Sequence, residues 1–476
     1  MAGSLQATPT YALQPSAQQV PTATNYITNF DFLNQYLPDT YEKEFERYGN
    51  RTISAFLRMV GAEIPSNSDL VKWAEQGRLH IKYTNVGTAA LVNADTATFQ
   101  VNDTGVPAFT ASNGIALRVG QTIVVIQNDG SGSNKGIVTA VDLANDQFDV
   151  AFYEAGGLVT AGTALGNADV TVFIYGSEFE KGTAGMSGSV EADDEIFENS
   201  PIILKDKYAV NGSDMAQIGW VEVTTENGAT GYLWYLKSEH ETRLRFEDYL
   251  ETSMIEAVPA EAASGAIAAG LKGSEGIFYT VGDRGNVWAG GNPASLAEFD
   301  TIISRLDKQG AIEENVIFLD RDFGFDIDDM LAAQNSYGVG GTSYGLFDND
   351  EQMALNLGFT GFRRGYDFYK SDWKYLNDPT MRGGLPTGAG SGRVNGLLVP
   401  AGTTSVYDQV LGKNAKRPFL HIRYRASQTE DRKMKTWITG SAGGAATSDL
   451  DAMEVNFLSE RCVCTMGANN FFLFEE

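Results

Sequence analysis

The sequence predicts an α+β fold in which a β-rich module interrupts a larger body of mixed helix and strand. Three observations point to this class. Residues 84–176 are rich in Thr, Val, Ala, Gly and Asp, with short apolar or alternating runs typical of strands joined by turns. Residues 231–257 contain no proline and follow the 3–4 apolar spacing of a helix. Residues 261–405 then mix helical and strand-like segments.

The first element, residues 1–28, is predicted to be an extended arm. Residues 1–25 are dominated by Ala, Thr, Gln, Pro and Ser, and they lack the charged and apolar regions of a signal peptide. Such an arm can pair its backbone with another chain and become ordered on binding. Residues 29–80 follow as a helical segment, with apolar side chains at helical spacing up to Val60 and a short helix expected at 66–77.

An extended loop is expected over residues 81–207, with the β-rich module at about 93–174. Its strands are predicted at 122–127, 136–142, 147–153 and 169–175, and the Asn- and Gly-rich turn 128–134 separates the first two. Arg118 and Lys135 are the only cations between residues 84 and 176. This composition indicates an inserted module, for which a small barrel is the expected form.

The longest helix is predicted at 231–257, within a region that spans 208–260. Its 27 residues would extend over about 40 Å, and Pro259 ends it. Region 261–405 should contain a helix at 294–308 stopped by Gly310, a buried strand at 315–320 and a helix at 325–335, with Gly-rich loops at 337–345 and 382–396. Region 406–476 should contain strands at 418–424, 433–439 and 456–464 and an apolar stretch at 470–474.

The chain is strongly acidic, with a net charge of −26 from 35 Lys plus Arg against 61 Asp plus Glu. Such a surface repels phosphate backbones and anionic lipid, so it argues against general nucleic-acid or membrane binding. It would keep a concentrated protein soluble until it assembles. Cys462 and Cys464 are the only cysteines, and we expect them to be small buried residues rather than a disulfide.

An acidic segment, residues 177–207, follows the β-rich module, and Gly182, Gly185 and Gly188 separate its carboxylates. Such a run is usually a solvated loop, and the alternative is a connector that meets a basic partner. The candidates for a subunit interface in this segment are Glu178, Glu180, Glu191, Asp193, Asp194 and Glu195.

Two basic patches are further candidates for contacts between subunits. The first, residues 359–375, mixes cations with aromatic side chains, as single-stranded nucleic-acid sites and protein interfaces both do. The negative charge of the chain favours the interface, so we select Arg363, Arg364 and Trp373.

The second basic patch lies between residues 413 and 435. Only Glu430 and Asp431 oppose its cations within this range. It could accept the acidic segment of a neighbouring subunit, a complementarity that sets register more than affinity. Its interface candidates are Lys416, Arg417, Arg423 and Arg425.

Motifs for catalysis or metal binding are weak, so we expect neither enzyme activity nor a cofactor. Residues 341–345 match the serine-hydrolase pattern around Ser343, but no strand precedes the serine as a nucleophile elbow requires. The acidic run that begins at Asp320 has Phe325 where a calcium-binding loop needs glycine, which leaves helix-start carboxylates and salt bridges. The histidines, His80, His240 and His421, show no zinc-ligand spacing.

The order of these features resembles that of the major capsid proteins of tailed bacteriophages, the Johnson-fold family. In that family an N-terminal arm precedes an extended two-stranded loop, a peripheral domain with a long spine helix, an axial domain and a return to the peripheral domain. The resemblance assigns 1–28 to the arm, 29–80 and 208–260 to the peripheral domain, 81–207 to the loop with its insertion, 261–405 to the axial domain and 406–476 to the return.

Two segments can be placed within this resemblance. Residues 175–182, Tyr-Gly-Ser-Glu-Phe-Glu-Lys-Gly, would lie on the descending strand of the extended loop. Residues 24–30, Thr-Asn-Tyr-Ile-Thr-Asn-Phe, together with the spine region, are most similar to crAss-like phages. The β-rich insertion makes the loop longer than a minimal one.

The resemblance implies a subunit that forms hexamers and pentamers of an icosahedral shell around packaged double-stranded DNA. It also implies a portal, a scaffold and a maturation protease as partners, with decoration or auxiliary proteins as further candidates and no membrane. The protein would be made in the bacterial cytoplasm and end in the virion. The alternatives are a β-rich tail or glycan-binding virion protein, which leaves the long helix unexplained, and a hydrolase that uses Ser343.

Overall fold

The chain divides into two compact units, and each is described by itself. The computed structural model describes residues 56–57, 62–90, 95–101, 115–128, 132–157, 170–190, 194–216, 223–224, 230–231, 234–334, 361–386, 392–408, 413–442 and 446–476. Unit 1 comprises Met1–Lys72 and Glu198–Glu476, and unit 2 comprises Trp73–Phe197. The predicted arm, the helical spacing before Phe56 and the motif around Ser343 lie outside the described residues.

Unit 2 contains a closed β-barrel, which confirms the barrel expected from the sequence. The strands occur around the barrel in the order β3, β4, β7, β6, β5, β8, closing back on β3. Alternate side chains point inward, and the stacked rings of Phe99 and Phe148 lie at the centre of the core. The first strand begins at Lys82, before the expected module. The strands are β3 Lys82–Ala90, β4 Thr96–Val101, β5 Gln121–Gln127, β6 Ser133–Asp142, β7 Gln147–Phe152 and β8 Val170–Ser177.

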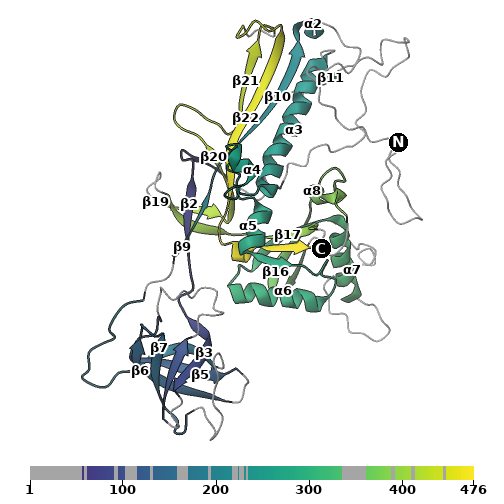
Figure 1. The fold of residues 1–476 in the computed structure, drawn as a ribbon. Coiled ribbons are helices and arrows are strands. Elements are labelled where there is room, and N and C mark those ends of the chain that lie inside the picture. The colour runs from purple at the N-terminus through teal and green to yellow at the C-terminus, as the bar shows by residue number, and fades with distance from the viewer. Residues whose placement is uncertain are drawn as a thin grey trace, which may run out of the picture. The chain divides into compact units, whose positions relative to one another are not determined.

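The first sheet of unit 1 lies beside the long helix predicted from the sequence, which spans Trp234–Glu256 as α3 (Figure 1). Phe246 and Leu250 of α3 pack on β10 and β22, and this side of the helix is apolar although many of its residues are charged. The sheet has the order β1, β20, β22, β10, and β21 also pairs with β22. Its strands are β1 Ala62–Ser66, β10 Ile202–Asn211, β20 Leu420–Arg425, β21 Lys435–Gly440 and β22 Ala452–Thr465.

The prediction of a short helix at 66–77 is wrong. The structure has β1 ending at Ser66 and a second strand, β2 Val71–Gln76, in its place. Strand β2 alternates half-buried and exposed side chains and pairs with β9 Asp194–Asn199 in a two-stranded sheet. The pairing with β9 and the β-forming residues Val71 and Trp73 override the capping signal.

The second sheet of unit 1 has six strands in the order β13, β23, β17, β14, β16, β15. Helices α6 and α7 cover one face, where Phe299 and Phe323 enter the core, and α5 covers the other face beside Phe318. The elements are α5 Ile277–Arg284, β13 Asn286–Trp288, α6 Leu296–Gln309, β14 Glu314–Leu319, α7 Arg321–Gln334, β15 Gly361–Arg364, β16 Tyr366–Asp372, β17 Val394–Pro400 and β23 Phe472–Glu475.

Local signals explain the ends of α6 and α7. Ser295 and Glu298 form a capping box at the start of α6, and Gly310 ends the helix with a left-handed φ of 69°, as predicted. Asp320 accepts a hydrogen bond from the backbone N–H of Phe323 at 2.7 Å, so α7 begins four residues before the expected position.

The Gly-rich loop predicted at 382–396 is only partly correct. Its last residues belong to β17, all seven of whose residues are buried. A Cβ atom at Gly396 would lie 3.0 Å from the Phe318 carbonyl oxygen and 3.2 Å from the Phe323 ring. The glycine therefore permits close packing inside the sheet rather than marking a loop.

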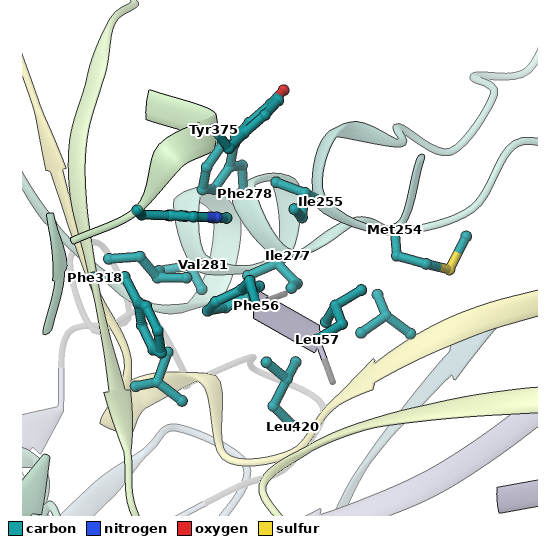
Figure 2. Close-up of a cluster of buried hydrophobic side chains, with 14 of the residues drawn as sticks. Phe56, Leu57, Met254, Ile255, Ile277, Phe278, Val281, Phe318, Tyr375 and Leu420 are labelled. Atoms are coloured by element: carbon teal, nitrogen blue, oxygen red, sulfur yellow. The ribbon is translucent and has the colours of Figure 1, made fainter. Parts of the chain in front are cut away.

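The core of unit 1 joins segments from the whole chain (Figure 2). Phe56 and Leu57 lie among side chains from the end of α3, from α5 and from both sheets. The Phe56 ring stacks on Trp373 at 4.4 Å and meets Phe318 edge-on at 4.6 Å. Cys462 and Cys464 are buried and unbridged in β22, which confirms the expectation for both.

The remaining elements are short. They are α2 Gly212–Met215, the pair β11 Val223–Thr224 and β12 Thr230–Gly231, α4 Gly265–Ala268, α8 Lys374–Asn377, the 3-10 turns η3 Arg382–Gly384 and η4 Ala468–Asn470, and the pair β18 Thr403–Asp408 and β19 Lys413–Pro418. The assignment of residues 29–80, 208–260 and 406–476 to a peripheral domain and of residues 261–405 to an axial domain stays a prediction.

Candidate interaction surfaces

The acidic segment that follows β8 is held against the barrel. The backbone N–H of Glu178 donates to the carbonyl of Gly120 at 3.0 Å, and the Phe179 ring packs beside the same glycine. A Cβ atom on Gly120 would lie 2.6 Å from that ring, and its φ of 90° also favours glycine. Further along, Arg118 Nη1 donates to the carbonyl of Gly188 at 3.0 Å. The first half of the acidic segment therefore follows the barrel surface.

The described interface candidates at the start of this segment, and Glu195, are solvated. Glu178, Glu180 and Glu195 are exposed, as either a solvated loop or a charged connector requires. The other candidates are Glu191 and Asp193, outside the described residues, and Asp194, the first residue of β9.

One of these carboxylates is paired within unit 2. The Tyr153 hydroxyl donates a hydrogen bond to Glu178. Burial of the phenol and this hydrogen bond raise the pKa of Tyr153 to about 12. Glu178 thus helps to fix the path of the acidic segment on the barrel.

The ribbon formed by β2 and β9 carries exposed apolar side chains. Trp73 and Phe197 lie 6.3 Å apart between ring centroids, and Lys72 bridges Glu198 at 2.7 Å. Ile196 is nevertheless 66% exposed. Among the described strands, neither β2 nor β9 pairs with a third one. A two-stranded ribbon has little stability in isolation, so this ribbon is a candidate for contact with another chain.

The two arginines selected in the first basic patch pair with carboxylates of unit 1. Arg363 Nε lies 3.1 Å from Asp367 Oδ1, and Arg364 Nη2 donates to Asp300 Oδ2 at 2.7 Å. Both side chains remain largely exposed. They stay interface predictions, with part of their charge already neutralised.

The aromatic side chains of this patch belong mainly to the core, and the prediction for Trp373 is wrong. Trp373 is 3% exposed and packs against Phe56 and Phe318. Tyr366 and Phe368 point to one face of β16 and pack with α6 and α7. The nearby cations in the sequence suggested a surface patch. In the structure, strand alternation points Tyr366 and Phe368 into the core, and Trp373 enters the core directly after the end of β16.

The second basic patch forms a network with carboxylates of its own chain. Glu460 in β22 lies 3.3 Å from Arg425 and 2.6 Å from Arg432. Arg425 also contacts Asp69, and Lys435 lies 2.9 Å from Glu430. The patch is therefore less positive than its sequence indicates, because Asp69 and Glu460 lie outside residues 413–435.

Glu63 in β1 extends this network. It lies 3.3 Å from Arg461 and also contacts Lys433. Glu63 and Arg461 are 398 positions apart, so no local pattern could have predicted the pair. The network attaches the segment before the barrel to the sheet after it.

The other candidates of the second patch occupy strands. In β19, Lys416 is opposite Ser405 and Arg417 is opposite Thr404. Arg423 is half-buried in β20, opposite Cys462 in β22. These positions stay interface predictions.

The acidic run that resembles a calcium loop forms a helix start and ion pairs, as expected. Asp320 caps α7 and lies 3.0 Å from Arg393 Nη2. Burial raises the pKa of Asp320, and both contacts oppose this shift. Asp328 lies 2.5 Å from Lys370 Nζ. Among the described residues, no cluster of three or more His, Cys, Asp or Glu side chains could hold a metal ion.

The histidine that could have served Ser343 is part of the core. His421 is buried in β20, and its Nδ1 lies 3.3 Å from the Pro418 carbonyl oxygen. None of the helices in the described part of the chain is long and apolar enough to span a membrane.

An ionic clamp at the end of α3 was missed by the sequence reasoning. Arg382 donates to both carboxylate oxygens of Glu256, at 2.5 and 2.6 Å, and the Tyr375 hydroxyl donates to the same carboxylate at 2.5 Å. Burial and the hydrogen bond to Glu256 raise the pKa of Tyr375. More than a hundred residues separate the partners, and no sequence spacing signals the clamp.

No protein-family model and no curated protein matches the chain. A solved chain from Microbacterium phage Oxtober96 is 11% identical over 92% of this chain and 96% of its own length, with a TM-score of 0.39. The capsid of the native GTA particle is 8% identical, with coverages of 94% and 98% and a TM-score of 0.37. The Cyanophage Pam1 capsid is 12% identical, with coverages of 63% and 82% and a TM-score of 0.35. The similar structures thus include phage capsids, at TM-scores too low to establish a shared fold.

Proposed function

We propose that this chain is a structural subunit, the major capsid protein of a tailed bacteriophage, and has no enzymatic role. It would form hexamers and pentamers of an icosahedral shell enclosing packaged double-stranded DNA. The finer expectations are a Johnson-type fold, a portal, a scaffold and auxiliary capsid proteins as partners, and a place in the virion. The assignment to crAss-like phages stays a prediction from the resemblance.

The observation that carries the proposal is the ribbon of β2 and β9. Its strands pair only with each other among the described residues, and Ile196 is exposed on it. Leu79, which follows β2, is 84% exposed. Burying such side chains against another copy would supply the cover that the ribbon lacks.

The charge of the chain supports the same proposal. A net charge of −26 lets a shell surround DNA without binding it tightly, because both are polyanions. It also means that copies repel one another at long range. Assembly would then depend on local apolar contacts, since salt screens the repulsion within about 10 Å at 0.1 M ionic strength.

The first experiment measures assembly of the purified protein by sedimentation velocity and negative-stain microscopy. We expect capsomers, sheets or closed shells that grow with protein concentration. Ile196→Glu should abolish these species and leave a folded subunit, because a charge would have to be buried at the contact.

Leu143→Glu is the matched control, because Leu143 is 62% exposed on a barrel turn of the same unit. It should assemble like the parent protein. A parent that stays a compact monomer at every concentration would refute the capsid proposal. Equal assembly by Ile196→Glu and the parent would remove the ribbon from it.

A further inference from the structure

The segment between α3 and α5, residues 258–273, forms a hairpin with a defined backbone path. Pro259 and Gly273 pair in an antiparallel bridge at its base, and the N–H of Ala260 donates to the Lys272 carbonyl at 2.9 Å. Inside the hairpin, the Ser264 hydroxyl accepts a hydrogen bond from the N–H of Ile267 at 3.3 Å, at the start of α4. This segment is therefore an ordered and exposed part of unit 1.

Two glycines hold the base of the hairpin tightly to the end of α3. A Cβ atom on Gly273 would lie 2.4 Å from the Val258 carbonyl oxygen, and one on Gly276 would lie 2.6 Å from the Ala257 carbonyl oxygen. Gly276 N–H also donates to that Ala257 carbonyl at 2.8 Å. A loop fixed in this way loses little conformational entropy when it binds a partner.

The hairpin exposes an apolar surface. Leu271 is 62% exposed, Val258 is 58% exposed and Ile267 is 44% exposed. The N–H of Leu271 donates to the Ala266 carbonyl at 2.9 Å, which brings Leu271 back to α4. Most of the other exposed side chains are methyl groups, which let a partner backbone approach closely. They belong to Ala262, Ala263, Ala266, Ala268 and Ala269.

The charge of the hairpin favours a second copy of this chain as its partner. Glu261 and Lys272 are its only charged residues, so it is neutral within a chain of net charge −26. Two copies of this chain repel over most of their surfaces, and a neutral apolar surface is where they can meet. The Ser264 hydroxyl already caps α4, so the hairpin offers little to a polar ligand or a nucleic acid.

We infer that the hairpin at 258–273 is a contact between copies of this chain, with Leu271 and Ile267 as its apolar centre. This inference rests on the proposed self-assembly and adds a second surface to it, in unit 1. Each copy would bury Leu271 against a neighbouring copy, and the alanines would permit the close approach.

The test compares Leu271→Glu with Leu450→Glu in the full chain. Leu450 is 45% exposed on another loop of unit 1, so the control carries the same chemical change. We expect Leu271→Glu to raise the protein concentration needed for assembly at least tenfold and Leu450→Glu to change it less than twofold. Leu271→Gln should give an intermediate increase, because it removes the apolar contact without adding charge. Circular dichroism melting should show folded subunits for all three variants.

A second measurement locates the contact directly. Hydrogen exchange read by mass spectrometry should show protection of residues 258–273 in assembled protein relative to dilute subunits. Normal assembly of Leu271→Glu, or unchanged exchange of the hairpin on assembly, would overturn the inference while the capsid proposal stands. A parent protein that never assembles would instead refute the capsid proposal, and the hairpin inference with it.

Discussion

The two units of the chain differ in whether the edges of their sheets are paired. In unit 2, six strands close into a barrel, so each strand has a neighbour on both sides. Among the described strands of unit 1, both large sheets stay open: β1, β10 and β21 lie at the edges of one of them, and β13 and β15 end the other. A closed barrel satisfies its backbone groups internally, whereas an open edge can pair with another chain. The difference indicates that the barrel itself is a self-sufficient module, whereas the open edges of unit 1 are available for pairing, as are those of the β2–β9 ribbon.

The cores of the two units differ in the same way. The barrel core is drawn from one continuous stretch, between Tyr83 and Val172. The largest core of unit 1 combines side chains from Phe56 to Leu473, and the barrel sequence interrupts it. The barrel can therefore form from local pairings, but unit 1 needs contacts across nearly the whole chain.

Phe148→Ala should produce the largest loss of stability, and this loss should be confined to the barrel. Phe148 is 1% exposed and stacks on Phe99 at 5.6 Å between ring centroids. Its truncation should destabilise unit 2 by about 3–5 kcal/mol, the usual cost of a buried Phe→Ala change. Hydrogen exchange should show faster exchange in β5 and β8 and unchanged protection in β14 and β17.

Trp373→Ala is the converse control for this prediction. It removes an equally buried ring from unit 1 and should accelerate exchange in β14 and β17 but not in the barrel. If either variant weakened both units equally, the division into independent units would be wrong.

Removing the ion pairs of Glu460 should produce the next largest loss of stability, and this loss should be confined to unit 1. Glu460→Gln keeps the side-chain volume and removes the charge that pairs with Arg425 and Arg432. Because the carboxylate is largely buried, we expect a loss of about 1.5–3 kcal/mol in the unfolding free energy of unit 1. Urea unfolding followed by exchange in β20 and β22 measures this loss.

Glu430→Gln controls for the loss of a carboxylate in the same network. Glu430 is more exposed and pairs with Lys435, so its removal should change stability little. Equal effects of the two substitutions would show that the buried ion pairs of Glu460 stabilise unit 1 no more than an exposed pair does.

The difference between the units also explains which features the sequence predicted. The barrel strands β5 to β8 were predicted because alternation and turn residues are local signals, and α6 was predicted from its apolar spacing and Gly310. Strand β17 was missed because Gly396 resembles a loop residue, although contact with the Phe323 ring requires it. The helix expected at 66–77 was wrong because the pairing of β2 with β9 is a long-range effect.

The candidate surfaces were harder to predict than the fold, for a related reason. Charge composition located both basic patches but not their partners, since Glu63 and Arg461 are 398 positions apart. Trp373 was predicted to be an interface residue because no local pattern signalled its burial, which depends on Phe56, a residue distant in sequence. The apolar hairpin was overlooked because exposure of Leu271 is a property of the fold.

The smallest predicted effect is the pH dependence of an ion pair that holds the edge strand β10 in unit 1. Lys207 in the edge strand β10 lies 2.9 Å from Glu454 in β22, and its hydrogen bond lowers the pKa of Glu454. A lowered pKa means that the folded state favours the carboxylate, so the stabilisation is present above the unfolded pKa of about 4.3 and is lost as pH falls through the folded pKa. Glu454→Gln should therefore cost about 0.2–1 kcal/mol at pH 7 and almost nothing in strong acid, as measured by urea unfolding. Asp449→Asn, which removes an exposed carboxylate before β22, should show no such pH dependence. A penalty for Glu454→Gln that persisted in acid would mean that packing, rather than charge, holds this edge strand in place.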